Sequence, residues 1–83
     1  MEFKNGENKI YLEDENGNVI AEIEFEKLEG NIYNIFHTYV DDSLRGKGVA
    51  SKLVEKAVSE IKSRGGKIQA TCSYAKAWLE KHQ

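Results

Sequence analysis

The sequence contains no proline and only one cysteine, and it has no long apolar run. A single cysteine excludes an internal disulfide and a zinc site built from several cysteines, and it is typical of a reducing, cytoplasmic compartment. No apolar stretch approaches ~18 residues and no charged-then-apolar leader comes first, so we expect neither a membrane span nor a signal peptide. Without proline, nothing interrupts the strands described below.

An excess of charge of one sign is also lacking. The chain has 12 Lys and Arg against 14 Asp and Glu, for a formal net charge of −2. This balance argues against a nucleic-acid partner held by bulk positive charge. At 83 residues we expect a single domain, residues 1–83. Its core should be small, because a chain of this length buries only about 60% of the surface that its unfolded form exposes.

Turn signals divide the first forty residues into short strands. Asn5-Gly6 and Asn16-Gly17 are typical of hairpin turns, and Glu29-Gly30-Asn31 predicts a third turn. Between the turns, apolar and polar residues alternate with the period of a strand, and the third segment has an acidic face made by Glu22, Glu24 and Glu26. The last segment is apolar and aromatic on both sides, which predicts a central strand. The expected strands cover residues 1–5, 9–14, 19–26 and 32–40.

The second half of the sequence predicts a strand–helix–strand unit. Apolar residues recur at helical spacing at Val49, Ala50, Leu53, Val54, Ala57, Val58 and Ile61. Gly65-Gly66 ends this helix, residues 67–72 predict a strand, and residues 74–82 predict a short helix capped by Ser73. A strand, a helix and a strand in succession give a right-handed crossover with parallel strands. The fold class is therefore α+β, an antiparallel β-meander joined to a βαβ unit with a short C-terminal helix.

A glycine-bearing turn, Arg45-Gly46-Lys47-Gly48, opens the long helix. The first N–H groups of a helix have no partner inside it, and the helix dipole adds partial positive charge there. Glycine lets a phosphate approach the backbone, and the two basic side chains add full charges. The pattern indicates a phosphate or pyrophosphate site at residues 45–50. The alternative, a solvated turn with two glycines, stays open at this point.

The stretch Arg45-Gly46-Lys47-Gly48-Val49-Ala50 resembles the Q/R-x-x-G-x-G/A signature of the GNAT superfamily of N-acetyltransferases. His37-Thr38-Tyr39-Val40, residues 44–50 and Thr71-Cys72-Ser73-Tyr74-Ala75-Lys76 are similar to the minimal, poorly characterised branch of that superfamily. The resemblance implies acetyl-CoA as the cofactor. It implies that backbone amides hold the pyrophosphate and that the pantetheine arm bonds to Val40, where the parallel strands splay. The implied cofactor-binding residues are Val40, Leu44, Arg45, Gly46, Lys47, Gly48, Val49 and Ala50.

The resemblance also implies acetyl transfer to an amine, on a small molecule or a protein that the sequence does not identify. The catalytic candidates are Cys72, His37 and Tyr74. Cys72 precedes a helix, which favours its thiolate, so it is a candidate to accept the acetyl group or to form a mixed disulfide with coenzyme A. The alternative is a small buried hydrophobe on one strand face. Tyr74 is a candidate acid for the leaving thiolate, as the resemblance implies, or an aromatic that packs on the sheet.

His37 has a suitable unperturbed pKa for a base, and it lies three residues before the strand end, about 10 Å below the rim. The alternative is an ordinary core or surface histidine, and Tyr39 is most simply a strand aromatic. We expect no metal, because no His, Asp, Glu or Cys cluster has metal-ligand spacing. The acidic row predicts a solvated face, with attraction of a basic acceptor as a minor option.

Two further hypotheses compete with the transferase. No helical pattern precedes the first strand, where GNAT members usually carry the helices that wall the acceptor site. This difference favours a module that binds coenzyme A or an acyl derivative without turnover. The other hypothesis is a small interaction domain whose turn binds nothing. The sequence does not indicate the oligomeric state.

Overall fold

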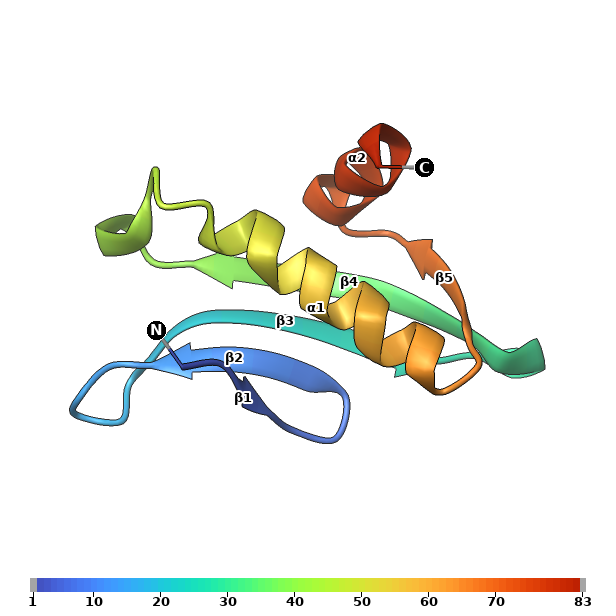
Figure 1. Ribbon diagram of the computed structural model, residues 1–83, viewed down its shortest axis with the longest axis horizontal. Helices are drawn as coiled ribbons and strands as arrows, with labels where there is room; N and C mark the ends of the chain where they lie inside the picture. The colour runs from blue at the N-terminus through green and yellow to red at the C-terminus, as the bar shows by residue number, and fades with distance from the viewer. Residues whose placement is uncertain (1, 83) are drawn as a thin grey trace.

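The computed structural model describes residues 2–82, and it contains a five-stranded sheet and two α-helices (Figure 1). The strands are β1 (Lys4–Asn5), β2 (Lys9–Glu13), β3 (Val19–Lys27), β4 (Ile32–Val40) and β5 (Lys67–Ala70). They lie in the order β1-β2-β3-β4-β5, and every neighbouring pair is antiparallel except the parallel pair of β4 and β5. The predicted α+β meander with a βαβ unit is confirmed, although Met1 lies outside the described residues.

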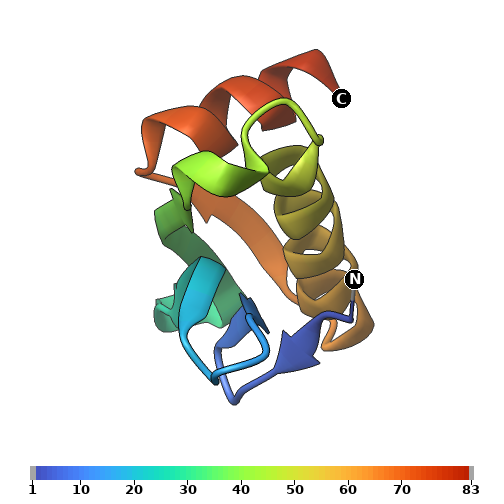
Figure 2. The same ribbon diagram turned by 90° about the vertical axis from the view of Figure 1, so that its left-hand side faces the viewer.

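The helices are α1 (Val49–Ser63) and α2 (Ser73–Lys81), and short 3-10 turns lie at Glu29–Asn31 and Asp42–Leu44. α1 packs lengthwise on one face of the sheet, and α2 lies beside α1 (Figures 1 and 2). The apolar stripe of α1 is fully buried at Leu53, Val54, Ala57 and Ile61. No helix within residues 2–82 is long and apolar enough to cross a membrane.

The core lies between α1 and the inner face of the sheet. Ile23 of β3 and Ile35 of β4 are both 0% exposed, as is Ala75 of α2. Burial of a side chain such as Ile or Leu stabilises the fold by about 1.5–3 kcal/mol. The alternation predicted for β3 thus selects which of its faces meets α1.

The pairing of β3 with β4 contains a bulge. Phe25 pairs with Ile35 but Glu24 pairs with His37, so Phe36 is an extra residue on β4. Because side chains alternate along a strand, the bulge decides which face each later residue of β4 occupies. Thr38 pairs with the buried Ile23 and lies on the inner face, whereas His37 lies on the outer face.

The strand predicted at residues 67–72 was too long at its end. The pairing of β5 with β4 stops at Ala70 opposite Ile35. The N–H groups of Thr71 and Cys72 both donate to the carbonyl of Ile35, at 3.1 and 3.2 Å, so the chain turns away from the ladder there. β4 continues to Val40 without β5 beside it.

The predicted cap of the C-terminal helix was also wrong by one position. α2 begins at Ser73, and the N-cap residue is Cys72, whose side chain makes no capping hydrogen bond of standard geometry. The early turn away from β4 moves the helix start forward. It also places the only thiol of the chain at the junction of β5 and α2.

Gly66 provides a test of this packing. A Cβ at this position would overlap the ring of Tyr33, with Cε1 at 2.6 Å, and would lie 3.0 Å from Cγ2 of Ile61. We expect Gly66→Ala to lower the free energy of unfolding by about 1–3 kcal/mol, as overpacking does. Urea denaturation of the variant and of the unmodified protein measures this difference in the free energy of unfolding. The control is Gly65→Asn, at a φ of +73° with open space around it, and a control loss as large as that of Gly66→Ala would contradict the packing argument.

Candidate active site

A pocket of about 210 Å³ opens where β4 ends and α1 begins. It contains seven of the eight residues predicted to bind the cofactor, together with the catalytic candidate Tyr74. Lys47 is the exception, because it lines a neighbouring hollow with Phe3 and Lys52. The lining residues are Val40, Asp41, Leu44, Arg45, Gly46, Gly48, Val49, Ala50, Ser51 and Tyr74.

The backbone at the pocket has the form expected of an anion site. Gly46 and Gly48 have φ angles of +82° and +71°, a region that side-chain-bearing residues rarely adopt, and a Cβ on either would meet no atom within 4 Å. The first hydrogen bond into α1 runs from the N–H of Lys52 to the carbonyl of Gly48 at 3.1 Å. Within residues 2–82, the three preceding N–H groups, of residues 49–51, have no acceptor. Free donors and the helix dipole both favour a phosphate here.

The charged side chains of the turn are solvent-exposed. The guanidinium of Arg45 lies 3.0 Å from the carboxylate of Asp42, and their side chains are 83% and 88% exposed. Exposed pairs of this kind contribute little to stability, whereas an arginine–phosphate contact is short and charge-assisted. Arg45 is therefore able to exchange Asp42 for a phosphate at little cost.

Two residues of the pocket were not predicted, Asp41 and Ser51. The Asp41 carboxylate accepts a hydrogen bond from the N–H of Ser43 at 3.0 Å, and the Ser43 side chain and N–H lower its pKa. The Asp-x-Ser turn pattern was the available signal. Ser51 accepts a hydrogen bond from the indole of Trp78 at 2.8 Å, which fastens α2 to the first turn of α1. No local pattern reveals that contact.

Cys72 lies half-buried at the fork between β4 and β5. Its sulfur is 3.2 Å from the hydroxyl of Thr38 on the inner face of β4. Burial raises the pKa of the Cys72 thiol, but the Thr38 hydroxyl opposes this effect. The backbone N–H groups of Ala75 and Tyr74 add to that opposition, and the net pKa lies below the ordinary value. A lowered pKa favours the thiolate, which is the nucleophilic form.

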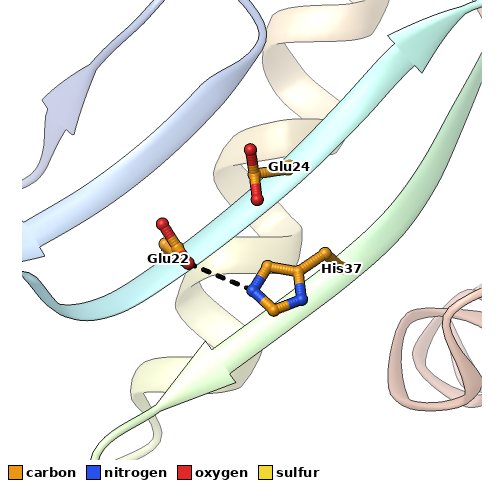
Figure 3. A group of neighbouring side chains, drawn as sticks. All are labelled: Glu22, Glu24 and His37. Atoms are coloured by element: carbon orange, nitrogen blue, oxygen red, sulfur yellow. Dashed lines mark hydrogen bonds and ion pairs between the residues drawn. The ribbon is translucent and has the colours of Figure 1, made fainter.

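His37 is not part of this site. Its Nε2 lies 3.1 Å from a carboxylate oxygen of Glu22 on the outer face of the sheet (Figure 3). Thr38, which reaches Cys72, lies on the opposite face of the same strand. Cys72 and Tyr74 therefore both lie at the start of α2, where only Tyr74 lines the pocket, and His37 is separated from them by the sheet.

Spacing along the chain predicts no metal site, but the structure contains a group of possible ligands that such spacing does not reveal. The register of β3 and β4 brings Glu22, Glu24 and His37 together, with one ligand atom from each lying within 4.8 Å of the others. Residues that lie far apart in sequence become neighbours through strand pairing. Spacing within one segment cannot reveal such a group.

Comparison with known proteins identifies the family. The family model described as GCN5-related N-acetyl-transferase matches residues 9–83, which is most of the chain. The chain therefore belongs to the family of GCN5-related N-acetyltransferases, as the signature at residues 45–50 predicted.

Individual relatives agree with this assignment. An NMR structure from Staphylococcus aureus, provisionally named a GCN5-like N-acetyltransferase, is 44% identical with a TM-score of 0.80, covering 98% of this chain and 79% of that one. A crystal structure provisionally named a phosphinothricin N-acetyltransferase is 32% identical with a TM-score of 0.65, covering 89% of this chain and 52% of that one.

A curated relative matches over a shorter stretch. It is YwnH of Bacillus subtilis (strain 168), provisionally named a phosphinothricin acetyltransferase, and it is 48% identical over 50 residues. The match covers 55% of this chain and 31% of that protein, so the matched stretch spans about a third of the curated relative's length.

The thiol at the fork yields a prediction about reactivity. Alkylation of Cys72 by iodoacetamide, followed against pH, should show a midpoint below that of an ordinary cysteine. Thr38→Val removes a hydrogen bond that stabilises the thiolate, so it should raise the midpoint and slow alkylation at pH 7 several-fold. Thr38→Ser keeps the hydroxyl and should behave like the unmodified protein. An unchanged midpoint in Thr38→Val would refute the assigned cause.

Proposed function

We propose that this chain is a single acetyl-CoA-binding domain that transfers the acetyl group to an amine. The observation that carries the proposal is the set of unpaired N–H groups of residues 49–51, which open onto a pocket behind a two-glycine turn. The family membership supports acetyl-CoA as the anion that fills it. Among the residues present, the backbone from Gly46 to Ser51 suits the diphosphate, with Arg45 as the neighbouring cation.

The free edge of β4 suits the pantetheine arm. From residue 36 to Val40, β4 has no strand beside it on the β5 side, because the parallel pairing ends at Ile35 and Ala70. An extended molecule with amide groups binds such an edge through main-chain hydrogen bonds, as an added strand does. The arm would run from the pocket at Val40 toward the fork, where Cys72 lies.

The chemistry proposed at the fork uses Cys72 and Tyr74. The Cys72 thiolate attacks the carbonyl carbon of the acetyl thioester, a new C–S bond forms, and the C–S bond to coenzyme A breaks. The departing thiolate takes the proton of the Tyr74 hydroxyl. An uncharged amine then attacks the acetylated Cys72, which leaves as a thiolate, and the proton released by the amine restores Tyr74.

His37 has no place in this route, since its ring lies on the other face of the sheet from Cys72. The acceptor is an amine of a small molecule or of a protein. Two relatives carry names that specify phosphinothricin, which makes this amino acid a suitable first compound in an acceptor panel.

Binding is tested by isothermal titration with acetyl-CoA. The unmodified protein should bind with a stoichiometry of one. Arg45→Glu reverses the charge beside the diphosphate and should weaken binding at least about tenfold, or roughly 1.4 kcal/mol. Gly48→Trp fills the open space at the turn and should abolish binding, with circular dichroism to establish that α1 is intact.

The matched control is Lys62→Glu, which makes the same charge reversal in the last turn of α1. This variant should bind as the unmodified protein does. Absence of binding by the unmodified protein would eliminate the proposal, and equal weakening by both reversals would mean that bulk charge rather than the turn holds the ligand.

Turnover is tested separately, by chromatography of coenzyme A released in the presence of an amine panel. We expect release above the protein-free rate, and an intact mass increased by one acetyl group when no amine is present. Cys72→Ser should bind acetyl-CoA normally but lose both signals. Release that persists in Cys72→Ser would overturn the role of this thiol, and binding without release for any amine would instead identify a module without turnover.

A further inference from the structure

The outer face of the sheet carries a second group of reactive side chains. Glu22 and Glu24 of β3 and His37 of β4 project from the face opposite α1, and Figure 3 shows them in front of the strands with α1 behind. One ligand atom from each residue lies within 4.8 Å of the other two. This group has no part in the acetyl-CoA site proposed above.

The bulge in β4 assembles the group. Glu24 pairs directly with His37, and Glu22 is the next residue of β3 on the same face. If the ladder continued without a bulge from the pair of Phe25 and Ile35, the partner of Glu24 would be Phe36 rather than His37. A local irregularity of the ladder thus sets an imidazole beside two carboxylates on a rigid pair of strands.

The geometry agrees with ligation of a metal ion. Nε2 of His37 and Oε2 of Glu22 are 3.1 Å apart. Two ligands bound to zinc at about 2.0–2.1 Å in a tetrahedral arrangement lie roughly 3.3 Å from each other. The two atoms share a hydrogen bond at this separation, which is also close to the separation that a shared zinc ion requires. Glu24 offers a further oxygen within 4.8 Å of both.

The charge of the group also favours a cation. Two carboxylates and one imidazole leave a net negative charge whichever form His37 takes. Among residues 2–82, no lysine or arginine forms an ion pair with Glu24. Lys9 of β2 lies opposite Glu24 in the strand register. Its ammonium group, however, lies over the ring of Tyr11, 5.0 Å from the ring centre.

The side chains of His37 and Glu22 are 41% and 23% exposed, so an ion can reach them from solvent. We propose that Glu22, Glu24 and His37 bind a divalent transition-metal ion, zinc foremost, with water completing the coordination. An imidazole with two carboxylates suits zinc, whereas magnesium and calcium prefer oxygen ligands alone. The ion would tie β3 to β4 beside the bulge. This inference does not depend on acetyl-CoA, and its test involves none.

The experiment is zinc titration by calorimetry of the Cys72→Ser protein, which lacks the only thiol and so removes a competing ligand. We expect one zinc ion per chain and a rise in the thermal midpoint. His37→Asn and Glu24→Gln should each weaken zinc binding at least tenfold, and magnesium should not compete. The ring ¹⁵N resonances of His37 should shift on zinc addition.

The chain contains only two histidines, so His82→Asn is a matched control that should leave zinc binding unchanged. Circular dichroism establishes that each variant is folded, and Glu24→Gln gives a second test if His37→Asn is not. Three results would overturn the site: no zinc binding by Cys72→Ser, equal binding in the Glu24 and His37 variants, or loss of binding in the His82 variant.

Discussion

The parallel pairing of β4 with β5 ends early, and the proposed function depends on that. β5 leaves the sheet after Ala70, whereas β4 continues to Val40. The carbonyl of Ile35 receives two N–H groups, from Thr71 and Cys72, and this forked bond turns the chain outward. Beyond the fork, β4 presents an unpaired edge. A fully paired β5 would leave no edge for an extended ligand and would bury the sulfur among strand neighbours.

A second constraint holds the other wall of the pocket in place. The apolar stripe of α1 is buried against the sheet, and that burial fixes where the helix begins. The turn before it needs two glycines with positive φ angles to bring the chain from the end of β4 into α1. The free N–H groups therefore follow from the fold itself. The bond from Trp78 to Ser51 then sets α2, with Tyr74, beside the same opening.

Periodic and local features of this protein could be predicted from the sequence. The stripe of α1 and the alternation of β3 each repeat over several residues, so single exceptions do not hide them. The turn at residues 45–48 could be interpreted because helix N-termini have unpaired donors whatever the surrounding fold. Seven of the eight predicted cofactor-binding residues do line one pocket.

Features that depend on register or on distant contacts could not be predicted. The end of β5 is set by hydrogen bonds from the N–H groups of Thr71 and Cys72 to the carbonyl of Ile35. Ile35 lies thirty-five residues before Ala70, its partner in the ladder. The group of Glu22, Glu24 and His37 depends on a bulge that the sequence does not signal, and the contact of Thr38 with Cys72 depends on the same bulge. In each case the deciding partner lies on another strand.

The central claim is that unpaired amides at the start of α1 bind the diphosphate of coenzyme A. Amide chemical-shift mapping with coenzyme A tests it most directly, since it reports each N–H group separately. The account predicts that the largest shifts fall on residues 46–51, with a second group along residues 36–40 of β4. Saturating coenzyme A that leaves residues 46–51 unshifted would contradict it.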